Sequence, residues 1–157
     1  MATPTVVHST FVTERSYPKP PAVVFAAFAD PAKKRRWFAE GHSHKVEEFA
    51  MDFRVGGVEV TRYRFTEGSP FPGVALSTEG TIQDIVDGRR IVSASTMTLG
   101  ERHISSSLVT VELVATESGT DLIFTHQGAF YEGSDGPEMR EAGWKTLLDR
   151  LTTEVAG

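Results

Sequence analysis

Apolar and polar residues alternate with a period of two through the middle of the chain, which is typical of β-strands with one buried face. The clearest alternation covers 58–65 and 120–127, and strands are also predicted at 75–86, 90–98 and 104–115. Weaker patterns predict two more strands, at 11–17 and 46–53. Glycine-containing turns separate several of these strands, so we expect antiparallel neighbours that form a meander. A bulge is expected near Gly80.

Helical patterns lie on either side of these strands. Two short helices are predicted at 22–29 and 31–38, and Asp30 suits the capping position of the second. The longest helix closes the chain, and Asp135 and Glu138 form a capping box at its start. Its apolar stripe consists of Trp144, Leu147, Leu148, Leu151 and Val155.

One curved sheet with a single long helix to cover its apolar face predicts an α+β fold. We expect about six to seven antiparallel strands around the C-terminal helix, with the two short helices after the first strand. Pockets between a sheet and a helix are common binding places for small molecules. The pattern therefore predicts an internal cavity for a small apolar ligand.

Composition narrows the classes of function. The 157 residues fit one domain, which we place at 10–157 after a flexible N-terminus at 1–9. The absence of cysteine excludes disulfides and cysteine nucleophiles and suits a cytoplasmic protein. A formal net charge of −5 disfavours a nucleic-acid partner. No apolar run is long enough for stable membrane insertion, and a homodimer is compatible with all these features.

Glu59 is the first candidate for a functional residue. It shares strand parity with Tyr63 and Phe65, so inward-facing aromatic rings there would bring a carboxylate inward as well. Carboxylates with a perturbed pKa gather at functional sites, where they act as general acids or bases. The alternatives are a structural ion pair with an arginine and a side chain that faces solvent.

His126 is the second candidate. It continues the alternation of Leu122 and Phe124, so we expect it on the inner face of the sheet, near the rim of the cavity. An acid–base pair with Glu59 requires that the sheet bring the two within hydrogen-bond reach, and Tyr63 is the other candidate partner of Glu59. The alternative is a histidine that is hydrogen-bonded at the sheet edge.

Other polar motifs add little chemistry. Ser95 and Ser107 lie on neighbouring strands and would supply cavity hydroxyls if they face inward. The chain has no Gly-x-Ser-x-Gly elbow and no dinucleotide fingerprint. His42 and His44 lack a third ligand at a diagnostic spacing, so we predict no metal and no cofactor. The basic run 33–36 is interpreted as a solvated helix face, with an anionic head group or membrane surface as the alternative.

Several motifs share their order and spacing with a known superfamily. They are Ala29-Asp30-Pro31, Arg36-Trp37-Phe38, the stretches 52–59 and 104–112, Gly119-Thr120, the stretch 126–130, and Gly143-Trp144 followed by Leu147. Together they resemble the helix-grip (SRPBCC) superfamily of lipid-transfer (START) domains, the birch-pollen allergen and polyketide cyclases. Within it, the chain is similar to homologues of the heat-shock-protein-90 ATPase activator.

This resemblance implies a helix-grip fold and places Trp37 and Phe38 beside the entrance of its cavity. Gly143 is expected to let the last helix approach the sheet or a ligand closely. Resemblance and strand parity together predict the following ligand-binding residues: Trp37, Phe38, Phe53, Glu59, Tyr63, Phe65, Ser95, Ser107, Phe124, His126, Gly143, Trp144 and Leu147.

Three functions are compatible with these predictions. The leading one is a non-catalytic carrier or sensor of a small hydrophobic molecule. The second is an enzyme of the cyclase, dehydratase or hydrolase type that uses Glu59 with His126 or Tyr63. The third is a co-chaperone-like or stress-response interaction module, which would expose a large apolar patch.

Overall fold

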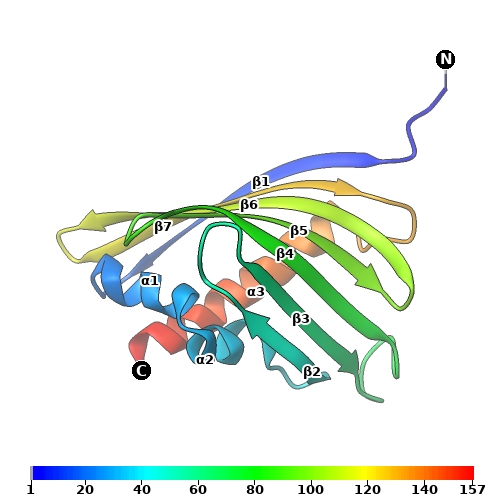
Figure 1. Cartoon of the computed structure of the whole chain (residues 1–157), viewed down its shortest axis with the longest axis horizontal. Coiled ribbons are helices and arrows are strands. Elements are labelled where there is room, and N and C mark those ends of the chain that lie inside the picture. The colour runs from blue at the N-terminus through cyan, green and yellow to red at the C-terminus, as the bar shows by residue number, and fades with distance from the viewer. Residues whose placement is uncertain (1) are drawn as a thin grey trace.

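The computed structural model describes residues 2–157 (Figure 1). It contains seven strands, three short helical segments and one long helix. In chain order the elements are β1 (Val7–Tyr17), α1 (Pro21–Ala29), α2 (Pro31–Lys34), the π-helical turn η1 (Arg35–Ala39), β2 (His44–Met51), β3 (Val58–Phe65), β4 (Ala75–Val86), β5 (Arg90–Leu99), β6 (Arg102–Thr116), β7 (Gly119–Phe130) and α3 (Pro137–Ala156).

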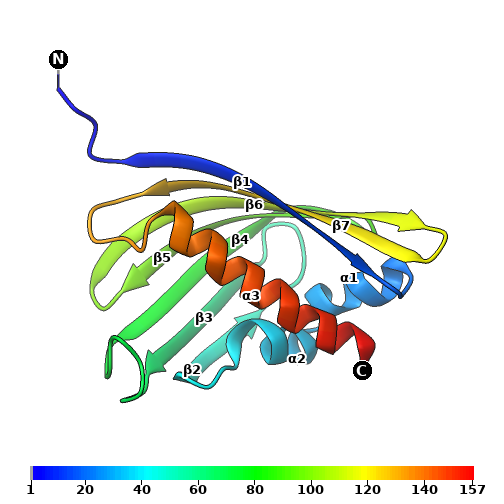
Figure 2. The same cartoon turned by 180° about the vertical axis from the view of Figure 1, so that it is seen from behind.

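The strands form one antiparallel sheet in the order β1-β7-β6-β5-β4-β3-β2. Strands β2 to β7 are a meander, and β1 closes the sheet by pairing with β7. The sheet curves, and α3 crosses its concave side diagonally (Figure 2). The predicted α+β helix-grip fold is confirmed.

The core lies where α1, η1 and α3 pack against the concave side of β1, β6 and β7. Its fully or almost fully buried members include Phe28, Trp37, Phe124, Leu148 and Leu151. Each buried side chain of this size contributes roughly 1.5–3 kcal/mol through the apolar surface it removes from water. This half of the sheet is therefore the rigid part that positions the remainder.

Two strand details differ from the sequence prediction. β1 begins at Val7, so residues 7–9, which we expected in a flexible N-terminus, pair with β7; Met1 lies outside the described residues. The irregularity in β4 lies between Ile82 and Asp84 and not near Gly80. Gly80 is in regular register with Ser95.

Of the two helix caps predicted from the sequence, the one of α2 is confirmed and the one of α3 is wrong. The carboxylate of Asp30 accepts hydrogen bonds from two backbone N–H groups in the first turn of α2, as predicted. The capping box of α3 is wrong, because Gly136 occupies the cap position with a φ of 85° and offers no side chain. Asp135 instead binds Arg140, at 2.8 Å from both its Nε and its Nη2.

Candidate functional site

The sheet register determines which candidate residues share a surface. Glu59 on β3 is paired with Gly80 on β4, which is paired with Ser95 on β5. Ser95 is in turn paired with Ser107 on β6, and Ser107 with Gly128 on β7. Because side chains alternate between faces, this whole row points the same way. The inner-face parity predicted for Glu59, Tyr63 and Phe65 agrees with this register.

Small side chains run across the concave face along this row: Gly80, Ser95, Ser107 and Gly128. Four residues on the same face are buried beneath the helices: Ile82, Ile91, Val111 and Phe124. Their low exposure shows that a residue of this face gains little solvent contact through the convex side of the sheet. Thr78, Ser95, Met97 and Ser107 are only half-buried. Solvent therefore reaches them from the concave side.

We call this uncovered surface, around Thr78, Ser95, Met97 and Ser107, the hollow. α3 makes its main contacts with η1, β1 and α1, and it crosses the concave side of the sheet diagonally (Figure 2). On the helix, Gly143 is exposed, and a side chain added there would meet nothing within 4 Å. The expected close approach of α3 to the sheet at Gly143 is therefore wrong.

Aromatic side chains fill the space beside the hollow, at the end covered by η1. Only a cavity of about 40 Å³ remains there, which holds a few water molecules at most. It is lined by Phe28, Lys34, Trp37, Phe53, Glu59, Ile82, Ile91, Ser93, Val109, Val111, Phe124 and Trp144. This cavity is smaller than the ligand-sized one that the sequence predicts between sheet and helix.

Two aromatic residues of η1 differ in role. The Trp37 side chain is 2% exposed, and its Nε1 donates a hydrogen bond to the carbonyl oxygen of Ala27 at 2.8 Å, so it anchors the helical corner. The Phe38 ring lies 5.7 Å from the Trp37 ring and 5.6 Å from the ring of Trp144. Phe38 and Trp144 are half-buried and connect the closed core to the surface of α3.

Glu59 faces inward and forms an ion pair with Lys34. Both of its carboxylate oxygens accept hydrogen bonds from the Lys34 ammonium, at 2.7 and 2.9 Å. The two side chains are only 14% and 19% exposed, and the ammonium also lies 4.9 Å from the centre of the Phe38 ring. A structural ion pair with an arginine was one alternative for Glu59; the structure shows an ion pair, and its partner is a lysine of the basic run 33–36.

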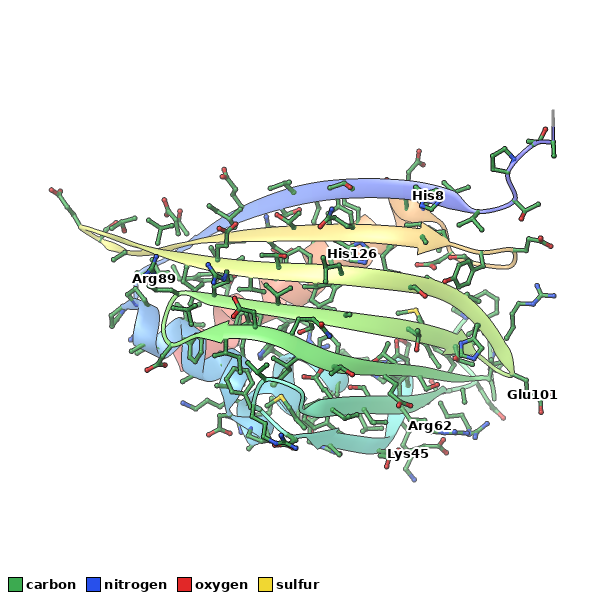
Figure 3. All side chains as sticks on the ribbon, turned by 45° about the horizontal axis from the view of Figure 1, so that its top comes forward. His8, Lys45, Arg62, Arg89, Glu101 and His126 are labelled. Atoms are coloured by element: carbon green, nitrogen blue, oxygen red, sulfur yellow. The ribbon has the colours of Figure 1, made fainter. Side chains whose placement is uncertain are left out.

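His126, labelled in Figure 3, belongs to β7 and is buried, so it does not lie at a rim as predicted. It is 1% exposed and stacks on Phe11, with ring centres 4.9 Å apart. Burial lowers its pKa to about 4, and the charge of Arg140 acts in the same direction. Its Nδ1 is buried without a hydrogen-bond partner among the described residues. His126 is therefore a neutral core histidine at neutral pH.

The predicted acid–base pair is not brought together. Strands β4, β5 and β6 lie between Glu59 on β3 and His126 on β7, and each strand spacing adds roughly 4.8 Å. The Glu59 carboxylate binds Lys34 instead. Tyr63, the other candidate, stacks on His44 with ring centres 3.9 Å apart, and burial raises its pKa to about 12. Its hydroxyl therefore stays protonated at neutral pH.

A second buried ion pair borders the hollow and was missed by the sequence reasoning. Arg140 is 6% exposed, binds Asp135, and donates from Nη2 to the Ser105 hydroxyl at 3.0 Å. Ser105 is paired with Met97 of the hollow. Arg140 precedes Trp144 by four residues, and this charged position on the apolar stripe is the signal that could have revealed the pair.

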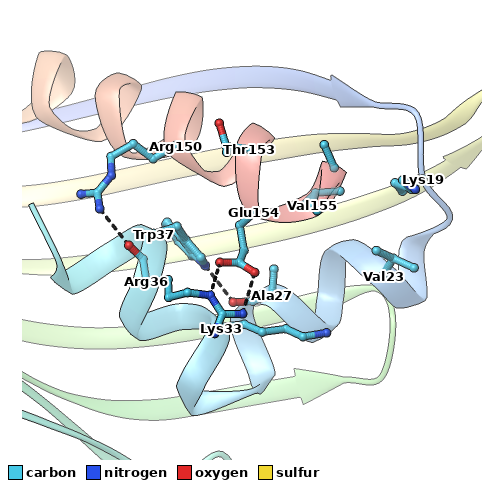
Figure 4. A pocket seen from close by; sticks show the side chains of 12 residues that line it. Lys19, Val23, Ala27, Lys33, Arg36, Trp37, Arg150, Thr153, Glu154 and Val155 are labelled. Carbon is cyan, nitrogen blue, oxygen red and sulfur yellow. Dashed lines mark hydrogen bonds and ion pairs between the residues drawn. The ribbon is translucent and has the colours of Figure 1, made fainter.

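A groove of about 770 Å³ lies elsewhere, at the C-terminal end of α3 (Figure 4). Arg36 donates to both carboxylate oxygens of Glu154 at 2.9 Å, and Arg150 donates to the backbone carbonyl of Arg36 at 2.8 Å. Within the basic run, Arg35 pairs with Glu40. Three of its four cations thus bind separate carboxylates and tie helical segments to the fold, instead of forming one basic face.

A family model described as "Activator of Hsp90 ATPase homolog 1-like protein" matches residues 18–156. A structure of a protein from Rhizobium leguminosarum is 35% identical, covers 96% of each chain and has a TM-score of 0.89. Mll3558 from Rhizobium loti is 45% identical over 95% of this chain and 98% of its own, with a TM-score of 0.84. An AHSA1-like protein from Aeromonas hydrophila shares the fold at 21% identity, over 94% and 92% of the two chains, with a TM-score of 0.69.

A comparison with curated proteins finds no match. Among residues 2–157, no helix has the length and apolar character needed to cross a membrane.

Proposed function

The chain belongs to the family of activator of Hsp90 ATPase homolog 1-like proteins, and from this premise we propose that it binds a small, largely apolar molecule in the hollow beside α3. One observation carries the proposal. The middle of the concave face, at Thr78, Ser95, Met97 and Ser107, is half-buried where a core sheet would be covered. The serines 95 and 107 are small, and on the helix a side chain added at Gly143 would meet nothing within 4 Å.

The surroundings of the hollow suit an apolar molecule. Trp144 and Phe38 are half-buried next to it, and Met97 lies in its floor. Burying apolar ligand surface against such side chains contributes roughly 25 cal/mol per Å². The closed cavity of about 40 Å³ is too small for this role. The ligand-binding residues predicted from the sequence therefore divide into Ser95, Ser107, Tyr63, Gly143 and Trp144 as proposed contacts and a core group that supports them.

The catalytic alternative has less support. It needs Glu59 to exchange a proton with His126 or Tyr63, whereas Glu59 is held by Lys34 and three strands separate it from His126. Tyr63 is protonated at neutral pH, since burial raises its pKa to about 12. A carrier or sensor needs none of these proton transfers.

Tryptophan fluorescence tests the proposal, because both tryptophans of the chain lie at informative places. In a Trp37→Phe variant, Trp144 is the single reporter beside the hollow. In a Trp144→Phe variant, Trp37 reports from the buried corner, where Ala27 accepts its hydrogen bond. Titration with 1-monolaurin, below its aggregation concentration, should change the emission of Trp144 saturably and leave that of Trp37 almost unchanged. A saturable change at Trp37 alone, or at neither residue, contradicts the proposal.

A filling variant provides the matched control. Ser95→Leu places an isobutyl group in the hollow and should abolish monolaurin binding while leaving the fold stable, since open space receives the side chain. Ser77→Leu makes the same change on the convex face of β4, because Ser77 points away from the hollow, and should leave binding intact. If the Ser95 site were closed core, overpacking would instead cost about 1–3 kcal/mol of stability.

A further inference from the structure

Hydroxyl groups gather on the concave face without protein partners. Three come from serines 93, 95 and 107, and the others belong to Thr61, Thr78 and Tyr63. None of these six hydroxyls forms a side-chain hydrogen bond within the described part of the chain, whereas Ser105 beside them does, to Arg140. A purely hydrocarbon ligand would bury these groups unpaired, at a cost of roughly 1–3 kcal/mol each.

Among these hydroxyls, that of Thr61 is the most deeply buried one without a hydrogen-bond partner. Thr61 is 2% exposed, and its Oγ1 is buried without a hydrogen-bond partner. The register pairs it with Thr78 of the hollow and places its side chain on the same face as Glu59 and Tyr63. Thr61 therefore has an unused hydrogen-bonding group at this edge of the hollow, which an oxygen or nitrogen atom of a bound molecule would satisfy.

The charges around the hollow are already balanced. At one end, Lys34 binds Glu59 with two hydrogen bonds of 2.7 and 2.9 Å. At the other, Arg140 binds Asp135 with two of 2.8 Å. An anionic ligand would have to displace one of these carboxylates or be buried without a counter-ion, and both are costly. The same holds for a cationic ligand and the two carboxylates.

From these observations we infer that the ligand of the hollow is an uncharged molecule that carries several oxygen atoms beside its apolar part. The hydroxyls of Ser95, Ser107 and Thr61 exchange hydrogen bonds with those oxygens, and Trp144 contacts the apolar part. The inference rests on the proposed function and narrows it, because it excludes fatty-acid anions and plain hydrocarbons as the preferred ligands.

Three probes with the same twelve-carbon chain separate these classes: 1-monolaurin (neutral, an ester and two hydroxyls), 1-dodecanol (neutral, one hydroxyl) and dodecanoate (anionic at pH 8). Binding to the Trp37→Phe protein is measured by Trp144 fluorescence. Each hydrogen bond to a neutral hydroxyl is worth roughly a two- to tenfold change in affinity. We therefore expect monolaurin to bind about tenfold more tightly than dodecanol and at least about tenfold more tightly than dodecanoate.

The double variant Ser95→Ala/Ser107→Ala identifies the source of that preference. It should lower the affinity for monolaurin by about tenfold and that for dodecanol by less, because dodecanol offers a single hydroxyl. Ser77→Ala removes a hydroxyl from the convex face and should alter neither. Dodecanoate binding as tightly as monolaurin, or an undiminished monolaurin preference in the double variant, overturns the inference and leaves the proposed function standing. Failure of all three probes to bind contradicts the proposed function itself.

Discussion

The ion pair between Lys34 and Glu59 offers a quantitative test of how the concave face is built. Lys34→Met keeps the aliphatic stem against Phe38 but removes the ammonium. Glu59 would then keep a carboxylate that is only 19% exposed and has lost both of its hydrogen bonds. Exposed pairs are worth about 0–1 kcal/mol, and removing one partner of a buried pair costs about 3–5 kcal/mol. For this mostly buried pair we expect a loss of about 2–3 kcal/mol.

The reverse change and the double change complete a thermodynamic cycle. Glu59→Met leaves an ammonium on a flexible stem that can turn towards water, so we expect a smaller loss of about 1–2 kcal/mol. Lys34→Met/Glu59→Met leaves no charge behind and should lie within about 1 kcal/mol of the unmodified protein. The two single losses sum to about 3–5 kcal/mol, so the coupling between the two sites should lie at about 2–5 kcal/mol.

Urea unfolding followed by circular dichroism at pH 7 and low salt supplies these values, provided that the m-values agree between variants. The refuting result is additivity. If the double variant is as unstable as the sum of the single variants, the Glu59 side chain does not depend on Lys34, and the inward placement of the carboxylate is wrong. A double variant more stable than the unmodified protein remains in keeping with replacement of a buried pair by apolar side chains.

Two further predictions concern the buried polar residues. The pKa of His126 is about 4 in the folded protein and 6.5 in the unfolded chain. Because the folded-state pKa is the lower one, the contribution of His126 to the free energy of unfolding is present above pH 6.5 and is lost as the pH falls towards 4. Between pH 7 and pH 5 this loss should be about 2 kcal/mol, and His126→Phe should lack it in urea unfolding at both pH values; an equal loss in both proteins would refute the assignment. Arg140→Met should cost about 2–3 kcal/mol by stranding Asp135, whereas Arg15→Met, which breaks an exposed 3.3 Å pair, should cost less than about 1 kcal/mol; equal losses would show that burial of Arg140 has no energetic consequence.

Strand periodicity was sufficient to predict most of the sheet and the facing of its residues. The alternation along 58–65 has a period of two, so one inward residue determines all the others, and Glu59 and Tyr63 follow from Phe65. Local turn chemistry likewise places strand ends, as at the turn between β4 and β5. These features depend on neighbours within a few residues, which is why the sequence alone is informative about them.

Features that depend on packing could not be predicted in this way. The partner of Glu59 lies 25 residues earlier, on a helical corner whose orientation is set by Trp37 and its contacts. The row of small residues from Gly80 to Gly128 appears only when four strands are placed in register. The cavity volume beneath the aromatic side chains is a small difference between the space enclosed by the sheet and helices and the volume of the side chains that fill it. The periodicity of the sequence contains no information about this difference. The sequence therefore could predict that a cavity lies between sheet and helix, but not its size.

The central claim is that a small molecule binds on the concave face at the hollow. Titration of the ¹⁵N-labelled protein with 1-monolaurin, followed by two-dimensional ¹H–¹⁵N spectra, tests it most directly. We predict saturable shifts of the amide signals of Gly80, Ser95 and Ser107 and of the indole N–H of Trp144. Shifts confined to the groove at Arg150, or no saturable shift on the concave strands, would contradict the account.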